Sequence, residues 1–274
     1  MRVIALLATY NEQRFIANCI EHLWQNGVET YLIDNDSTDR TLESAERYRG
    51  RGLVGTERLP RDGYSRLRER CERKEVLALE LDADWFVHLD ADEIRLPPSP
   101  RQTLREAFEE VERQGCNAVN FQEFVFVPTR ESPDHDHAGY PETMRWYYPF
   151  LPRSPHRLNA WKRQPARVDL AWSAGHQVRF PGLTMYPRPF PMRHYMYLSV
   201  AHAIRKYVPL RYDPQAVERG WHGKRVALRA EDIGLASAAD LRVFGGDAVL
   251  DASQPRVEHV LFQGRRGHRG HRGV

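Results

Sequence analysis

Strands and helices are predicted to alternate along residues 3–127, and this alternation limits the fold more than any other feature of the sequence. The predicted strands are short apolar runs, and the predicted helices repeat apolar residues at three- and four-residue spacing. Crossovers of roughly 20 residues favour a doubly wound, mostly parallel sheet. The predicted strands are 3–9, 29–33, 52–59, 85–89 and 118–127, and the predicted helices are 12–25, 40–49, 63–81 and 101–114.

Charge and proline content change near residue 127. Residues 1–127 carry 24 acidic and 17 basic side chains, whereas residues 128–274 carry 13 acidic and 23 basic ones, so their net charges are −7 and +10. Of the 18 prolines, only Pro60 precedes Pro97. The chain is therefore predicted to have a regular N-terminal part and a loop-rich, basic C-terminal part, with helices at 199–207 and 214–229. The Arg/Gly/His-rich tail, 265–274, is predicted to be disordered.

Acidic side chains follow two of the predicted strands directly. Asp90, Asp92 and Glu93 come after strand 85–89, and Asp34 and Asp36 come at the end of strand 29–33. Ligands of open parallel sheets bind outside the carboxyl ends of the strands. Closely spaced carboxylates there favour a hard divalent ion, Mg²⁺ or Mn²⁺, that also binds phosphate oxygens. The alternative is a loop with solvated acids.

Three motifs together resemble a known family. They are Ala8-Thr9-Tyr10-Asn11-Glu12, the run Tyr31-Leu32-Ile33-Asp34-Asn35-Asp36-Ser37-Thr38-Asp39, and Leu89-Asp90-Ala91-Asp92-Glu93. Their order and spacing are similar to those of family 2-type glycosyltransferases with the GT-A fold, in the branch with an "NE" start and a "DADE" metal motif. The resemblance covers about a third of the chain.

The resemblance implies a nucleotide-sugar site. Thr9, Asn11 and Glu12 would border the base and ribose, and either Asp34 or Asp36 would contact one of them. Asp90 and Asp92 would hold Mn²⁺ or Mg²⁺ and the ribose–pyrophosphate region of the donor. We expect Asp90→Asn and Asp92→Asn to abolish turnover with little loss of fold.

A third metal ligand in this fold often comes from a C-terminal histidine. His194 is the first candidate and His176 the second, ahead of His202. A packed or surface histidine is the alternative at each position. A second metal site at Asp134–His137 is also conceivable, although a solvated acceptor loop fits this run better.

Two further roles remain open between candidates. Lys74 interrupts the inward seam of helix 63–81, so it either contacts the nucleotide or the acidic edge, or extends from the helix edge into solvent; Arg70 is a weaker alternative. An inverting enzyme needs a base for the acceptor hydroxyl. The Glu-Asp pair that many relatives use is missing between residues 122 and 230, which leaves Glu123 first, and then Asp136 and Glu142.

The predicted activity is metal-dependent transfer of a sugar from a nucleotide-diphosphate donor, of the UDP or GDP type, to a hydroxyl acceptor, with inversion. The acceptor is a glycan, a lipid-linked compound or a small molecule. The predicted domain plan is a donor-binding core, 1–127, completed by an acceptor-side region, 128–264. The alternative is a degenerate GT-A protein that binds without turnover. A sugar-nucleotidyltransferase lacks support because no Gly-rich basic loop follows the first strand, and the absence of G-x-G-x-x-G disfavours a dinucleotide oxidoreductase.

Cellular context follows from what the sequence lacks. No secretory signal or membrane-spanning run is predicted, so a lipid-linked acceptor would be reached peripherally. Cys19, Cys71 and Cys116 are few and widely spaced, which favours a reducing cytoplasm. We expect no nucleic-acid partner.

Overall fold

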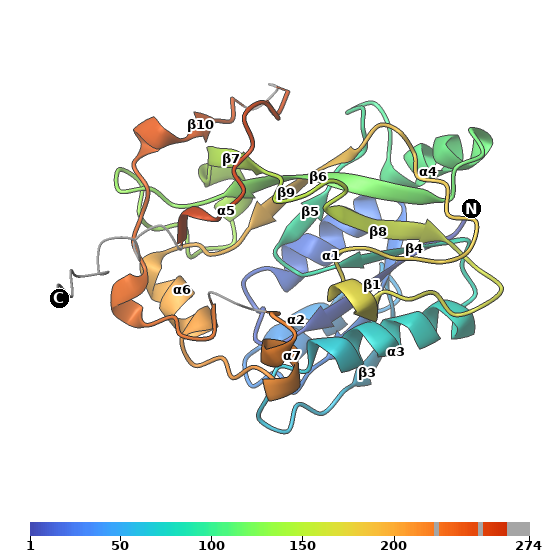
Figure 1. Ribbon diagram of the computed structural model, residues 1–274, viewed down its shortest axis with the longest axis horizontal. Coiled ribbons are helices and arrows are strands. Elements are labelled where there is room, and N and C mark those ends of the chain that lie inside the picture. Colours follow the sequence, from blue (N-terminus) through green and yellow to red (C-terminus); the bar gives the residue numbers. More distant parts are fainter. Residues whose placement is uncertain (222–224, 246–248, 262–274) are drawn as a thin grey trace, which may run out of the picture.

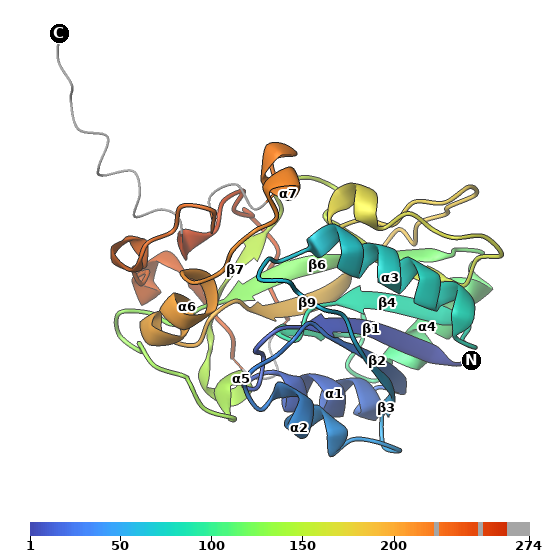
Figure 2. The same cartoon turned by 90° about the horizontal axis from the view of Figure 1, so that it is seen from below.

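One mixed sheet of ten strands runs through residues 1–221, 225–245 and 249–261, the part of the chain that the computed structural model describes (Figures 1 and 2). The strands are β1 (Val3–Thr9), β2 (Val28–Asp34), β3 (Leu53–Arg58), β4 (Trp85–Leu89), β5 (Glu93–Arg95), β6 (Ala118–Phe126), β7 (Trp146–Phe150), β8 (Arg157–Lys162), β9 (Phe190–Tyr195) and β10 (Arg242–Val243). The α-helices are α1 (Ile16–Gln25), α2 (Thr41–Glu46), α3 (Leu67–Glu80), α4 (Leu104–Arg113), α5 (Tyr140–Thr143), α6 (Val200–Tyr207) and α7 (Pro214–Glu218).

The first half of the sheet is the parallel α/β unit that the sequence predicted. Strands β3, β2, β1 and β4 are neighbours in that order, and all of their pairings are parallel. Their carboxyl ends therefore meet at one edge of the sheet. The segments after β1, β2 and β4 leave from this edge, which brings the three sequence motifs together.

Both faces of this half are covered, because successive side chains of a strand point to opposite faces. Val3, Ala5 and Leu7 of β1 belong to the core that includes α1 and α4. Ile4 and Leu6 belong to a second core, which includes α3. Figure 2 shows α3 on one side of the sheet and α1 and α2 on the other. The buried apolar run of β1 is explained by this double coverage.

The second half of the sheet is mixed. Strand β8 lies between β4 and β6 and is antiparallel to both, and β7 is antiparallel to β6. Strand β9 is parallel to β6 and antiparallel to β5. Residues 130–170, which show no clear periodicity in the sequence, thus supply two strands. Strand β9 joins the acidic turn after β4 to the C-terminal part of the sheet.

One sequence prediction fails in the C-terminal part. The helix predicted for 214–229 ends at Glu218 as the short α7. Gly220 follows with φ +77°, a backbone conformation that stops a helix and that favours glycine. The helix predicted for 199–207 is confirmed as α6, with the Ser199 hydroxyl accepting a hydrogen bond from the His202 amide at 3.1 Å.

Other predictions concern the cysteines, the tail and the membrane. Cys19, Cys71 and Cys116 are buried and form no disulfide with one another. The tail predicted to be disordered, 265–274, lies outside the described residues. No helix in the described ranges has the length and apolar character needed to cross a membrane.

Candidate active site

The acidic turn after β4 gives its two aspartates different surroundings. The Glu93 amide donates to the Asp90 carbonyl oxygen at 3.1 Å, and the Asp90 amide donates to the Glu93 carboxylate at 3.1 Å. The Asp90 side chain is exposed and lines a pocket, whereas Asp92 is 5% exposed. An exposed carboxylate is open to a ligand, but a buried one must have partners within the protein.

Lys206 is the main partner of Asp92. Its Nζ lies 2.8 Å from Asp92 Oδ2 and 3.0 Å from Glu12 Oε1, and it also lies 4.7 Å from the centre of the Phe15 ring. Three segments far apart in the sequence meet here: the loop after β1, the acidic turn and the last turn of α6. Lys206 was missed by the sequence analysis, because a lysine near a helix end has no distinguishing pattern.

The charged groups of this cluster shift one another's pKa values. Burial alone would raise the pKa of Asp92, but Lys206 and His194 outweigh it and hold this pKa below its usual range. Burial raises the pKa of Glu12 to about 7, although Lys206 opposes the rise. Burial would lower the pKa of Lys206, but Asp92 and Glu12 raise it well above the usual value. Lys206 therefore carries a positive charge at neutral pH.

His194 lies next to Asp92 because of strand pairing. In the β5–β9 pair, His194 is opposite Glu93, and its Nε2 lies 3.5 Å from Asp92 Oδ2. Its Nδ1 donates a 2.5 Å hydrogen bond to Glu123 Oε1. Burial would lower the pKa of His194, but Asp92 and Glu123 raise it to about 10. The structure thus brings the first predicted histidine ligand to the acidic turn.

Glu123, the first candidate for the catalytic base, lies behind this histidine. It is fully buried, and it is not among the residues that line the pocket. Besides His194, its carboxylate accepts hydrogen bonds from His156 Nε2 and Arg157 Nε, both at 2.9 Å. Burial would raise the pKa of Glu123, but Arg157 and the two histidines hold it well below the usual range. This geometry suits a residue that orients His194 and does not bring Glu123 to an acceptor hydroxyl.

Asp136, the second candidate for the base, does line the pocket. One of its oxygens lies 2.8 Å from Arg14 Nε, and the other lies 2.6 Å from Arg205 Nη2. His176 also lines the pocket, with its ring centre 5.3 Å from that of His156. Within the described part of the chain, His176 forms no ion pair with Asp90 or Asp92, whereas His194 Nε2 lies 3.5 Å from Asp92 Oδ2.

The loops after β1 and β2 form the other end of the site. Asn11 and Asp36 both have positive φ, +56° and +60°, and both line the pocket. Asn11 Oδ1 accepts a hydrogen bond from the Thr38 amide at 2.8 Å, which ties the two loops together. Thr9 and Asp34 are buried beneath them, and Asp34 accepts a bond from the Ser37 amide at 3.2 Å. Thr9 and Asp34 therefore shape the loops that Asn11 and Asp36 present to the pocket.

Three arginines line the same end without a close ion pair to a carboxylate in the described part of the chain: Arg61, Arg70 and Arg211. The guanidinium of Arg61 lies 3.7 Å from the centre of the Tyr10 ring, and Arg70 Nη2 donates to Ser65 Oγ at 3.2 Å. Asp36 pairs instead with Arg58, at 2.5 Å. This end of the pocket thus offers surplus positive charge and an aromatic face.

Lys74 lies below the pocket and does not line it. Its Nζ donates to His88 Nδ1 at 2.9 Å and lies 3.4 Å from the Leu89 carbonyl oxygen. The side chain is 1% exposed, so it does not extend into solvent. Burial lowers the pKa of Lys74 to about 8, although Asp90 opposes the change. Lys74 thus lies beneath the acidic turn, neither in the pocket nor in solvent, and its predicted role toward the nucleotide stays a prediction.

The residues at the turn fit a hard divalent ion. Among the described residues, no three His, Cys, Asp or Glu side chains converge as a complete metal site, and this includes Asp134–His137. However, Mg²⁺ is commonly bound by one or two carboxylates while water and phosphate oxygens complete its shell. Asp90 presents a carboxylate of this kind to the pocket, with Asp92 and His194 beside it.

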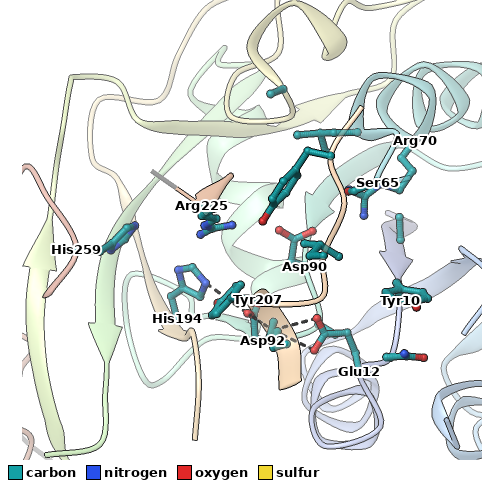
Figure 3. A pocket seen from close by; sticks show the side chains of 18 of the residues that line it. Tyr10, Glu12, Ser65, Arg70, Asp90, Asp92, His194, Tyr207, Arg225 and His259 are labelled. Atoms are coloured by element: carbon teal, nitrogen blue, oxygen red, sulfur yellow. Dashed lines mark hydrogen bonds and ion pairs between the residues drawn. The ribbon is translucent and has the colours of Figure 1, made fainter. Parts of the chain in front are cut away.

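The pocket has room for two substrates. Its volume is about 1520 Å³, above the roughly 300–1,000 Å³ of an ordinary ligand site. Figure 3 shows Tyr10, Ser65 and Arg70 on one side, His259 on the other, and the acidic turn between them.

The fold and this site define a GT-A type transferase: a parallel α/β half carries the loops after β1 and β2, and an acidic turn lies at the junction with a mixed half. The family model for Glycosyl transferase family 2 matches residues 5–155, just over half of the chain. The chain belongs to this family. No curated protein matches it significantly in sequence.

Solved structures give distant matches. The S. aureus TarS 1–349 structure in complex with UDP is 13% identical, with 72% of this chain and 61% of that chain covered and a TM-score of 0.42. Glucosyl-3-phosphoglycerate synthase from Mycobacterium tuberculosis, in complex with Mn²⁺, UDP and phosphoglyceric acid, is 20% identical over 45% of this chain and 43% of that chain, with a TM-score of 0.27. The chain thus spans about three fifths of the TarS fragment. The assignment of the chain to its family rests on the match over residues 5–155 and not on these structures.

Proposed function

We propose that the protein transfers a sugar from a nucleotide-diphosphate donor to a hydroxyl acceptor, with inversion at the anomeric carbon and with a divalent metal ion. The observation that carries this proposal is the position of Asp90. Its carboxylate is exposed in a large pocket, at the meeting point of the nucleotide loops and the second half of the sheet. The family match over residues 5–155 supports the same activity.

The donor is proposed to lie at the end of the pocket with Tyr10, Asn11 and Asp36. Tyr10 offers an aromatic surface, and Asn11 and Asp36 offer hydrogen-bonding groups for a base and ribose. The negatively charged diphosphate would extend toward Asp90 past Arg61 and Arg70. We propose a UDP or GDP type of donor.

In the reaction, the acceptor oxygen forms a bond to the anomeric carbon while the bond from this carbon to the β-phosphate oxygen breaks. The electron pair of the broken bond leaves with the nucleoside diphosphate, and the hydroxyl proton passes to a base. Mg²⁺ or Mn²⁺, held by Asp90 with Asp92 and His194 close by, would supply positive charge for the leaving diphosphate. Lys206 keeps Asp92 paired, and it adds a second positive charge at this point.

Of the three carboxylates predicted as candidates for the base, Asp136 is the one that lines the pocket, so it is the one proposed to reach an acceptor there. Its two oxygens are occupied by Arg14 and Arg205, so the proposal requires the acceptor to displace Arg205, which is 59% exposed at its side chain. Glu123 is proposed instead to orient His194, as a carboxylate commonly does for a histidine beside a metal ion.

A donor panel tests the proposed function. The protein is incubated with UDP-, GDP-, CDP- and TDP-sugars, with Mn²⁺ or with a chelator, and free nucleoside diphosphate is measured. Slow metal-dependent hydrolysis of one class, absent in Asp90→Asn, is the expected result. Binding of a nucleotide without any hydrolysis or transfer would favour a protein that binds without turnover.

A further inference from the structure

The pocket side opposite Tyr10 carries its own surplus of positive charge. We define the far wall by five pocket-lining residues: Arg153, His156, His176, Arg225 and His259. They come from the loop between β7 and β8, from the segments after β8 and α7, and from the C-terminal segment. None of them belongs to the donor residues discussed above, and Figure 3 shows His259 well away from Tyr10.

The acidic groups nearest the far wall are already neutralised by other residues. Glu93 pairs with Arg95 at 2.7 Å and with Arg157 at 3.5 Å, and Glu123 pairs with Arg157 at 2.9 Å. Glu258 also lines the pocket and has an interaction partner of its own. The carboxylates of this region therefore do not account for Arg153 and Arg225.

Arg153 and Arg225 have no carboxylate partner within residues 1–221, 225–245 and 249–261. Arg153 is exposed, and the half-buried Arg225 lies with its guanidinium 5.2 Å from the centre of the Tyr207 ring. Unpaired arginines held at a pocket wall are suited to planar or tetrahedral oxyanions, which they bind with two parallel hydrogen bonds.

Two imidazoles beside Arg153 have unused nitrogen atoms. His156 is 4% exposed and donates Nε2 to Glu123, so its Nδ1, which is buried without a hydrogen-bond partner in the described part of the chain, is an acceptor that would suit a hydroxyl of the ligand. Nδ1 of His176 is also buried and without a partner there. Buried polar atoms of a native protein are usually satisfied, so unsatisfied ones lining a pocket point to a ligand.

We propose that the far wall binds an oxyanion, a phosphate or carboxylate group, on the acceptor. The proposal rests on the proposed function, because it assigns the acceptor end of the same pocket. Arg153 and Arg225 supply the charge, and His176, in the tautomer that carries its proton on Nδ1, supplies a short-range hydrogen bond. The acceptor hydroxyl would then face Asp90 from the side opposite the nucleotide.

Binding to the protein saturated with UDP and Mn²⁺ tests this proposal. Isothermal titration at fixed ionic strength compares glucose 6-phosphate, glucuronate and glucose. We expect one or both anionic sugars to bind at least about tenfold more tightly than glucose, a difference that a single charge-assisted hydrogen bond can supply. The comparison of glucose 6-phosphate with glucuronate shows whether the site prefers a phosphate or a carboxylate. Equal binding of all three sugars would overturn the proposal.

Variants locate the site. Arg153→Gln combined with Arg225→Gln is expected to remove the preference for the anionic sugar and to leave UDP affinity within about threefold. Arg188→Gln is the matched control, because Arg188 is exposed and outside the pocket lining. Retained preference in the double variant, or displacement of the anionic sugar by UDP, would contradict the far-wall site.

The two proposals fail in distinguishable ways. A protein that binds UDP but does not prefer anionic sugars disproves the far-wall site alone. A protein that binds no nucleotide disproves the proposed function; the titrations are then repeated without UDP, and loss of anion binding in the double variant still decides the assignment of the far wall. If the double variant is unstable, the comparison of the three sugars in the unmodified protein decides it.

Discussion

Lys206 Nζ lies 2.8 Å from Asp92 Oδ2, so a lysine from α6 neutralises one of the two aspartates in the acidic turn. Among the residues that the structure describes, Asp90 has no such partner, and it is exposed in the pocket. The two aspartates of the D-x-D motif are therefore inequivalent: Asp90 is available to a ligand, and Asp92 also connects the turn to α6.

Asp90→Asn and Asp92→Asn should both reduce turnover at least about 100-fold, but only the second should affect the fold. Asp90 is exposed, so its substitution should change the free energy of unfolding by less than about 0.5 kcal/mol. Asp92→Asn leaves Lys206 without its closest partner and should cost about 3 kcal/mol. Urea denaturation of both variants measures these changes in the free energy of unfolding. Equal stabilities would contradict the inequivalence and restore the sequence-based expectation for Asp92.

Lys206→Met should destabilise the protein by about 3 kcal/mol at pH 7, because Asp92 and Glu12 would lose their shared cation. The loss should grow as the pH rises above 7, since Glu12 has a pKa of about 7 beside Lys206 and, without the lysine, keeps its proton to higher pH while the parent loses it. Lys162→Met is the control: its ion pair with Glu112 is largely exposed, so the loss should be below about 1 kcal/mol. A pH-independent loss in Lys206→Met would refute this explanation.

Lys74 predicts a pH dependence of stability. Its pKa is lowered from 10.5 to about 8 in the folded protein, so between these values the unfolded chain binds more protons than the folded one. The free energy of unfolding should therefore rise with pH across this window, by about 3 kcal/mol at most, relative to Lys74→Met. Denaturation curves of both proteins from pH 7.5 to 10.5 check the difference. If the stabilities of the two proteins change with pH in parallel, the pKa of Lys74 is not lowered in the folded protein.

Gly175 precedes His176 and has φ +87°, and a Cβ at this position would lie 2.6 Å from His88 Nε2. Gly175→Ala should cost about 2–3 kcal/mol, from backbone strain together with the clash against His88. Gly182→Ala is the matched control, because Gly182 also has a positive φ, +76°, but no atom lies within 4 Å of the position a Cβ would take. Gly182→Ala should therefore lose only about 1 kcal/mol of stability, from backbone strain alone. Similar losses of thermal stability in the two variants would disprove the close contact with His88.

The first half of the fold could be predicted from the sequence because local signals determine it. Strands such as 85–89 are apolar runs with helices between them, and a parallel sheet brings their ends together without further information. The three motifs at these ends could therefore be placed at one edge, and the match to residues 5–155 confirms the family.

The second half could not be predicted, because its strands depend on partners far away in the sequence. Strand β8 is inserted antiparallel between β4 and β6, a pairing that no local pattern indicates. Lys206 and the burial of Glu123 follow from this non-local packing. The second half contributes Lys206, which the sequence analysis missed, and it buries Glu123, which the sequence analysis had placed at an acceptor hydroxyl.

The most direct test of the central claim is the melting temperature of the unmodified protein and of Asp90→Asn, each with UDP, GDP, CDP or TDP and with or without Mn²⁺. A ligand that binds only the folded state raises the melting temperature by mass action. We predict that one nucleotide, together with Mn²⁺, stabilises the unmodified protein, and that the part of the shift due to Mn²⁺ is lost in Asp90→Asn. No shift with any nucleotide, or the same Mn²⁺-dependent shift in Asp90→Asn, would contradict a nucleotide–metal site at the acidic turn.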